Sequence, residues 1–276
     1  HFFATALYLT NNNIWDVPTL MRIQANSVAL ATLSGWVMES FFKETFSNFS
    51  LSLRTLVEAD YWDTTISIDD TTLFWRIFNN RHGKFSGSPL YVPVSSDAVQ
   101  GKDFIGSHVQ QYKQLVRWGW GIITFPMAVR GLLKAKNVSL GERLLWGYHF
   151  LERYAIWYTI IILITFGFPL LVLFNPAFRT TTFSFLLPQI TSYMLTVALL
   201  FLIPAAWFRQ KLTPPMPSDW PKWKRILIVF EGVLVIIHLF TYIFLPFVQA
   251  QTLFMFGKRM EKFEFTPKVR SGTATK

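Results

Sequence analysis

The sequence has no cysteine among its 276 residues and few charged residues, which make up 15% of the chain. The absence of cysteine excludes disulfide bonds and thiolate metal sites, although it does not indicate a cellular compartment. The scarcity of charge argues against a purely soluble domain, in which about a quarter of the residues are charged.

Hydrophobic and aromatic residues take the place of charged ones. They make up 51% and 17% of the chain, and the mean hydropathy is +0.32. Three apolar segments, 154–174, 183–207 and 226–248, each reach the length of about 20 residues that a helix needs to cross a bilayer. The sequence therefore predicts an integral membrane protein with about three transmembrane helices.

The chain is also strongly basic, with 26 Lys and Arg residues against 16 Asp and Glu residues and a net charge of +10. A nucleic-acid partner is one interpretation of such an excess. The basic residues flank the apolar segments instead of following one stripe, so contact with anionic membrane lipids and with diphosphates is the better interpretation. No nucleic acid is expected.

The two loops between the apolar segments differ in charge. Residues 175–182 contain one Arg, whereas residues 208–225 contain five basic residues and one Asp. Because basic loops stay on the cytoplasmic side, we predict that 208–225 and the region before the first apolar segment are cytoplasmic, at the plasma (inner) membrane. Three crossings would leave the basic tail outside. If one segment does not cross, we expect it to be the third, which alone contains ionisable residues.

Those residues are Glu231 and His238, which are two helical turns apart and share a helix face. Ionisable groups at membrane depth are functional by default. Both a hydrogen bond inside the helix bundle and a role in a polymer channel would explain them.

The region before the apolar segments has mixed α/β signals. Asp16-Val-Pro18 predicts a helix start within residues 14–42, whose apolar stretch is too short to span a bilayer. This helix should lie at the interface or dock on the protein. Residues 90–95 predict a short strand, at an edge because it contains Pro, and residues 106–118 predict a helix.

The most informative motif, Gln114-x-x-Arg117-Trp118, lies in that last helix. Positions i, i+3 and i+4 share one face. Arg offers a fork of donors for phosphate oxygens, Gln is both donor and acceptor, and Trp offers a flat surface for a sugar ring. The motif favours a sugar nucleotide's diphosphate beside a carbohydrate, although an amphipathic helix at a membrane surface has a similar composition.

The motif resembles the Q-x-x-R-W signature of membrane-embedded family 2 glycosyltransferases, which include cellulose, chitin and hyaluronan synthases. That family has an upstream acidic pair, usually Glu-Asp, and Asp69-Asp70 stands upstream here. The two residues could also simply cap a helix. Near the C-terminus, Phe263-Glu-Phe-Thr-Pro-Lys268 is similar to the F-x-V-T-x-K gating-loop motif of cellulose synthases, with Phe in place of Val. The resemblance covers about residues 45–268.

The resemblance implies an α/β fold of the GT-A type plus transmembrane α-helices. Residues 1–118 would be the C-terminal part of the cytosolic domain, followed by interfacial helices (119–153), transmembrane helices (154–250) and a basic tail (251–276). The implied activity is inverting transfer of a sugar from a nucleotide-diphosphate donor to a growing β-linked polysaccharide, with translocation across the membrane. The alternatives are transfer of a single sugar to a membrane lipid, and a non-catalytic membrane scaffold or transporter.

The family also implies the roles of individual residues. Asp70 would be the catalytic base, with Asp69 beside it. Gln114, Arg117 and Lys268 would bind the donor diphosphate, and Trp118 would bind the acceptor sugar. The gating loop would contain Phe263, Phe265 and Thr266.

A divalent metal, Mg or Mn, is part of the family's chemistry and is bound mainly by an Asp-x-Asp motif. No such motif occurs in residues 1–70, and the chain begins at His1 without a signal peptide. We therefore expect the C-terminal part of a longer protein, with the metal ligands upstream of it and no activity by itself.

Overall fold

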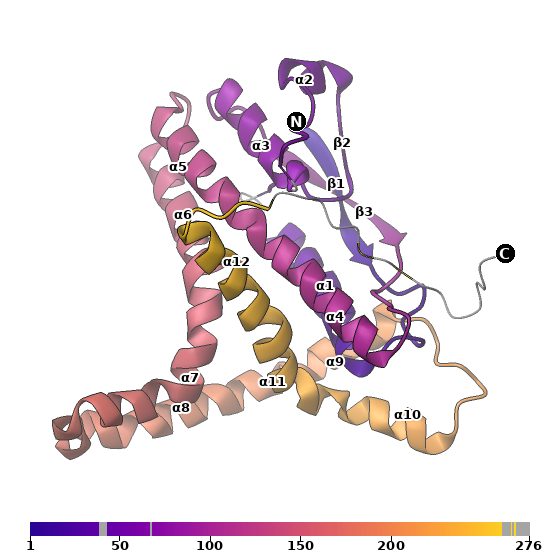
Figure 1. Ribbon diagram of the computed structural model, residues 1–276, viewed down its shortest axis with the longest axis vertical. Helices are drawn as coiled ribbons and strands as arrows, with labels where there is room; N and C mark the ends of the chain where they lie inside the picture. The colour runs from indigo at the N-terminus through magenta and orange to yellow at the C-terminus, as the bar shows by residue number, and fades with distance from the viewer. Residues whose placement is uncertain (39–42, 67, 261–265, 267, 269–276) are drawn as a thin grey trace.

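The computed structural model has a small sheet and several short helices beside a set of long apolar helices (Figure 1). The structure describes residues 1–38, 43–66, 68–260, 266 and 268. These residues are mainly helical, and their sheet has three strands in the order β2–β1–β3. The predicted combination of β structure and apolar helices is thus confirmed at a coarse level, with the strands confined to the N-terminal region.

The central strand is β1 (Phe2–Leu9), which pairs antiparallel with β2 (Phe49–Leu51) and parallel with β3 (Gly87–Ser95). β3 contains the predicted edge strand, and the strand order confirms its position. β1 has no counterpart among the predicted elements. Its Phe2 is fully buried, and a β-carbon at position 87 would come within 2.3 Å of the Phe2 ring. This contact therefore requires Gly87.

Five helices accompany the sheet: α1 (Thr19–Met38), α2 (Leu53–Glu58), α3 (Asp69–Asn80), α4 (Phe104–Gly119) and α5 (Thr124–Lys134). α1 begins directly after Pro18, as predicted. It packs against β1 and against the third apolar helix, so it is docked on the protein. The predicted signature helix is α4, and Asp103 caps it by accepting a hydrogen bond from the backbone N–H of Gly106 (2.6 Å).

Three long helices carry the predicted apolar segments, and each is long and apolar enough to cross a membrane. The first, Leu140–Phe174, contains α6 (Leu140–Leu151) and α7 (Trp157–Phe174). The second, Thr182–Leu212, contains α8 (Thr182–Leu200) and α9 (Leu202–Leu212). The third, Phe230–Met255, follows α10 (Lys222–Val229) and contains α11 (Val235–His238) and α12 (Leu245–Met255). The protein thus has the character of a membrane protein.

An aromatic core fixes the first apolar helix to α3. Trp75 of α3 is fully buried, and its ring centroid lies 5.0 Å from that of Trp146 on α6 in an edge-to-face arrangement. Phe150, one turn further along α6, also contacts Trp75. Such aromatic pairs contribute about 0.5–1.5 kcal/mol each beyond the burial of their surface. The helix that carries Asp69 and Asp70 is therefore held rigidly against the start of the apolar region.

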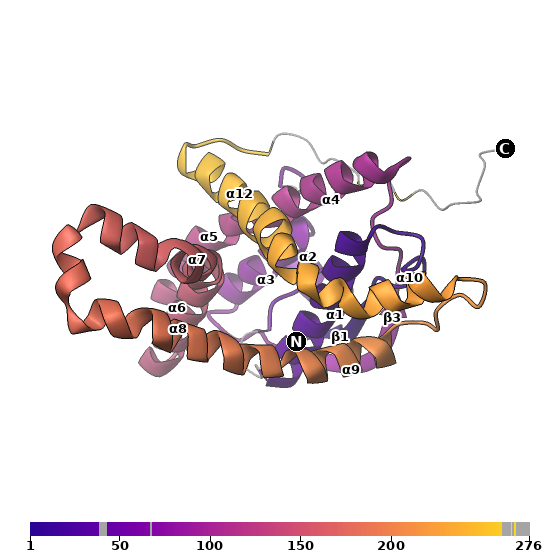
Figure 2. The ribbon, with the colours of Figure 1, turned by 90° about the horizontal axis from the view of Figure 1, so that it is seen from below.

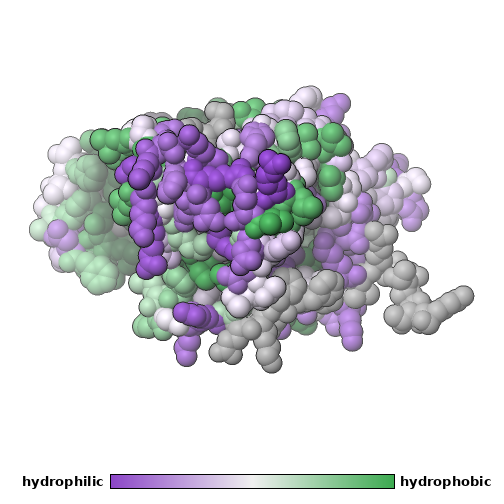
Figure 3. All heavy atoms as spheres, turned by 90° about the horizontal axis from the view of Figure 1, so that it is seen from above, coloured by the Kyte–Doolittle hydropathy of each residue, from purple (hydrophilic) through white to green (hydrophobic). Residues whose placement is uncertain are grey.

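The first two apolar helices form a hairpin. In Figures 1 and 2, α7 and α8 project together away from the sheet. Seen from above (Figure 3), hydrophilic residues gather over the centre of the molecule, and hydrophobic residues cover much of the left edge, toward which the hairpin projects. The apolar surface of this hairpin is suited to lipid.

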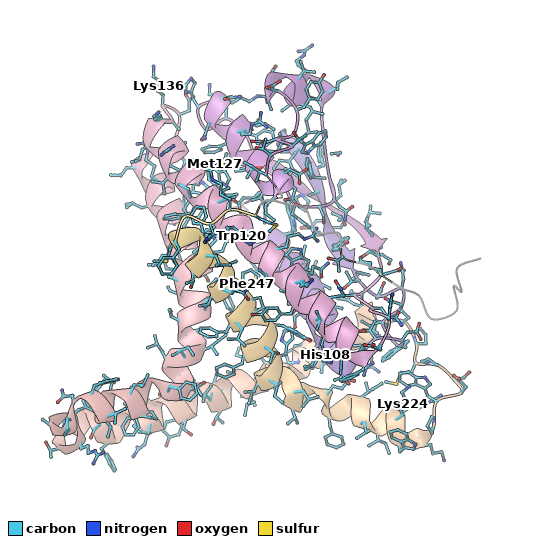
Figure 4. The ribbon with its side chains drawn as sticks, viewed as in Figure 1. His108, Trp120, Met127, Lys136, Lys224 and Phe247 are labelled. Atoms are coloured by element: carbon cyan, nitrogen blue, oxygen red, sulfur yellow. The ribbon has the colours of Figure 1, made fainter. Side chains whose placement is uncertain are left out.

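The third apolar helix differs from the other two in how it packs. In its most apolar 18-residue stretch, 22% of the residues are buried within the protein. The corresponding shares are 6% for the first helix and 0% for the second. Its α12 runs along α4, with Phe247 beside that helix (Figure 4). A β-carbon at Gly119 would lie 2.7 Å from Cβ of Ala250. Close approach of α12 to the signature helix therefore requires Gly119.

The basic loop and the tail both return to the sheet-bearing part. The Asn11 side chain donates a hydrogen bond to the carbonyl oxygen of Leu212 (3.0 Å), and the Trp15 indole donates one to the carbonyl oxygen of Pro214 (3.1 Å). Lys268 forms an isolated parallel bridge with Gln100. The basic loop and the tail therefore lie on the same side of the membrane as the sheet, which requires an even number of crossings before each of them. We predict that the first two apolar helices cross the bilayer and that the third does not.

Single cysteines test this topology without background, because the natural chain has none. In intact cells, a membrane-impermeant thiol reagent should label a cysteine at Thr181, which lies between α7 and α8, but not one at Ser218 in the basic loop. A cysteine at Lys258, directly after α12, should also stay unlabelled. Labelling at Lys258 would show that the third helix crosses, and labelling at Ser218 but not at Thr181 would invert the orientation.

Candidate functional site

Asp70 lies in the first turn of α3, and the helix N-cap is Ile68, which makes no side-chain cap. The Asp70 carboxylate is half-buried and accepts a hydrogen bond from the backbone N–H of Thr71 (2.8 Å), whereas Asp69 is exposed. The buried face of α3, which includes Leu73 and Trp75, fixes the direction of this first turn. The structure thus separates the acidic pair into one sheltered carboxylate and one exposed carboxylate.

The pKa of Asp70 is raised above its ordinary value. Burial is the largest cause, and the negative charge of Asp69 adds to it, while hydrogen bonds from Thr71 act in the opposite direction. A carboxylate whose pKa is raised is a stronger base once it is ionised, which suits a group that removes a proton.

Arg117 of α4 connects the acidic pair to the tail. Burial lowers the pKa of this guanidinium, and the charge of Asp70 partly offsets the shift. Desolvation likewise lowers the pKa of Lys268, with Asp97 opposing the shift and Arg117 adding to it. Asp70 thus acts on Arg117, while Arg117 and Asp97 act on Lys268, so two carboxylates and two cations from distant parts of the sequence are linked electrostatically.

A cavity beside Lys268 and Asp97, which we call the signature cavity, is lined also by Gln114 and Trp118, by residues of α1 and by the segment after β3. The Gln114 carbonyl accepts a hydrogen bond from the Gln111 amide (3.2 Å). Trp118 is 38% exposed, so part of its ring is open to a ligand. The predicted amide, indole and ammonium groups thus surround one space.

Two of the predicted tail residues can be placed. Thr266 is 8% exposed, and Lys268 lines the signature cavity beside its bridge to Gln100. Phe263 and Phe265 lie outside the described residues.

Sequence reasoning missed the contribution of α1 and of Asp97 to this cavity. Gln24 lines it with the apolar side chains of Met21 and Ala25. The available signal was a polar residue within a mostly apolar helix. That signal does not tell a cavity residue from a packing residue until the docking of α1 is known.

A second cavity, of about 420 Å³, borders the start of α3. Ile68 contributes to its wall, as do Trp120 and Phe254. Lys258 and Arg259 complete the wall on the side of the tail. This space thus borders Ile68, the residue directly before the acidic pair.

The described residues hold no group of three His, Asp or Glu side chains that could bind a metal ion. These residues therefore do not provide a ligand set for the expected divalent ion.

No protein family, curated protein or solved structure matches this chain. Its function must therefore be argued from its own residues and from the motifs they form.

Proposed function

We propose that the protein is an inverting glycosyltransferase of the membrane-embedded family 2 type, acting on a nucleotide-diphosphate sugar and a polysaccharide acceptor. The observation that carries the proposal is the cavity that Gln114, Trp118 and Lys268 line together. The charge of Arg117 acts on Lys268, and the charge of Asp70 acts on Arg117. A purely structural membrane helix would not need an amide, an ammonium group and a partly open indole around one space.

The chemistry follows from the groups present. The Asp70 carboxylate would take the proton from an acceptor hydroxyl as that oxygen bonds to the anomeric carbon of the donor. The bond between this carbon and the diphosphate oxygen breaks in the same step, and its electron pair leaves with the diphosphate. A single displacement inverts the anomeric carbon, so an α-linked donor gives a β-linked product without a covalent intermediate on the protein.

The cations serve the leaving group. Arg117 and Lys268 would neutralise the charge that grows on the diphosphate, and Gln114 would hold one of its oxygens or a nearby sugar hydroxyl. Such prearranged charges stabilise a transition state without the cost of reorganising solvent. Trp118 would support the acceptor ring by stacking. We propose further that the product is a polysaccharide that is extended stepwise and passed across the membrane.

Replacing Arg117 with Lys tests the diphosphate site, because Lys keeps the charge but loses the two-pronged geometry. With UDP as the probe nucleoside diphosphate, we expect its affinity to fall about 10–100-fold, since a hydrogen bond to a charged group contributes about 1.5–3 kcal/mol. Isothermal titration of the detergent-solubilised protein with UDP measures the change.

The matched control is Arg130→Lys, which makes the same change at an exposed position on α5. It should bind UDP like the unaltered protein. Equal affinities for the Arg117→Lys variant and the unaltered protein would remove Arg117 from the diphosphate site.

A further inference from the structure

Gln24 is a buried polar residue on the α1 wall of the signature cavity. Its side chain is 4% exposed, and its neighbours on that wall include the apolar Met21, Ala25 and Val28. A buried amide must find partners for its carbonyl oxygen and for its two N–H groups, or its burial is costly. The partners of Gln24 therefore indicate what the cavity is built to hold.

The carbonyl side of this amide is satisfied by the third apolar helix. His238 of α11 is 2% exposed, and its Nε2 lies 2.6 Å from Oε1 of Gln24. An amide oxygen only accepts hydrogen bonds, so Nε2 of the imidazole carries the proton and donates it. This bond fixes which way the amide points.

The nitrogen side of the same amide has no hydrogen-bond partner among the residues that the structure describes. Gln24 and Trp118 line the same cavity, so this amide supplies hydrogen-bond donors to the wall that the indole shares. A donor pair next to an aromatic face is chemistry suited to a neutral sugar, whose hydroxyl oxygens accept and whose ring stacks.

A second buried contact holds α1 in place two residues before Gln24. Arg22 is ion-paired with Glu231, and its Nε lies 3.0 Å from Oε1 of that residue. Thr19 donates a further hydrogen bond to Glu231 (3.2 Å). Because α1 is fixed at both Arg22 and Gln24, the amide is preorganised before any ligand arrives.

We propose that Gln24 binds a hydroxyl of the sugar ring that stacks on Trp118, and that His238 is the positioning residue that aims its amide. This inference rests on the proposed glycosyltransferase function and adds a determinant of acceptor choice. A site that hydrogen-bonds a hydroxyl discriminates strongly against an analogue without it, because its own polar groups are then left unpaired.

The test compares Gln24→Leu, His238→Leu and His238→Gln in the solubilised full-length protein. The probes are tetrasaccharides of β-linked glucose and of β-linked N-acetylglucosamine, and binding is measured by titration without donor. Loss of a neutral hydrogen bond of about 0.5–1.5 kcal/mol predicts affinity for the better probe reduced about 2–10-fold in Gln24→Leu and His238→Leu. His238→Gln retains a donor and should recover part of the loss.

A structural role would not give a selective effect, so the affinity for UDP is measured on the same samples and should be unchanged. The control is Gln249→Leu, which removes another bond between helices, the one from the Tyr112 hydroxyl (2.7 Å), outside the cavity. It should leave tetrasaccharide affinity unaltered. Normal tetrasaccharide affinity in Gln24→Leu, or no binding of either probe to the unaltered protein, would overturn the inference.

Failure of the proposed function would look different. If nucleotide sugars are not consumed by the protein, but the Gln24 and His238 variants still lose tetrasaccharide binding, then the sugar site stands and the transferase activity does not. If transfer occurs and depends on Asp70 while tetrasaccharide binding ignores Gln24, the activity stands and the sugar contact does not.

Discussion

Replacing Asp70 with Asn is expected to lower the rate of sugar transfer by about 10²–10⁴-fold, the usual contribution of a positioned general base. Asn has the shape of Asp but cannot take a proton. Affinity for UDP should change little, because Asp70 contributes to Arg117 only as a neighbouring charge. Turnover of UDP-sugar in membranes that contain the full-length variant, normalised to the amount of folded protein, measures the effect.

The pH dependence of the unaltered enzyme belongs to the same prediction. Burial and the Asp69 charge raise the pKa of Asp70, and the base works only when it is ionised. Activity should therefore fall as the pH drops through this raised pKa, at a higher pH than an ordinary Asp would give. Asp69→Asn removes a neighbouring negative charge and should move this acid limb to lower pH. Wild-type turnover in Asp70→Asn would exclude Asp70 as the base.

The largest stability effect is expected at the buried ion pair between α1 and the third apolar helix. Arg22 and Glu231 are 8% and 6% exposed. Glu231→Ala should lower the free energy of unfolding by about 3–5 kcal/mol, because it leaves the guanidinium buried without its counter-charge. Denaturant unfolding in detergent, followed by circular dichroism, measures the loss.

The chain offers a matched control in the Glu58–Arg81 pair, whose side chains are 50% and 29% exposed. Glu58→Ala should cost less than about 1 kcal/mol, since an ion pair in contact with water contributes little. The double variant Arg22→Met with Glu231→Leu removes both buried charges and should recover much of the loss of the single variant. Equal losses for Glu231→Ala and Glu58→Ala would mean that the buried pair does not stabilise the docking of α1.

Local patterns made part of the fold predictable. The apolar segments and the signature helix follow from run length and helical periodicity, which need only neighbouring residues. The first apolar helix begins earlier than predicted, at Leu140, where Ser139 and Glu142 form a capping box. Arg153 lies within this helix before the predicted segment, and its charge is paired with Glu44. Polar residues near the end of the third helix are tolerated because that helix lies along α4, where Gln249 accepts a hydrogen bond from Tyr112.

The strand β1 escaped prediction for a related reason. Its partners are β2 and β3, at residues 49–51 and 87–95, and a pairing over such a separation leaves no local signal. The residues of the candidate site likewise include some that local sequence predicts and some that only distant contacts bring together. Spacing along one helix picked out Gln114, Arg117 and Trp118, and motif order added Asp70 and Lys268. Gln24 becomes a cavity residue only through the docking of α1, which depends on side chains more than 200 residues away.

That separation has a consequence for how the protein is made. Arg22 and Glu231 are 209 positions apart, and at synthesis rates of about 5–20 residues per second the interval between them is roughly 10–40 s. Throughout this time α1 has left the ribosome without the partners of Arg22 and Gln24. The wall of the signature cavity can therefore close only after the third apolar helix has emerged. Chains that stop before it should present an unburied α1 to chaperones and proteases, so assembly of the site is coupled to completion of the membrane part.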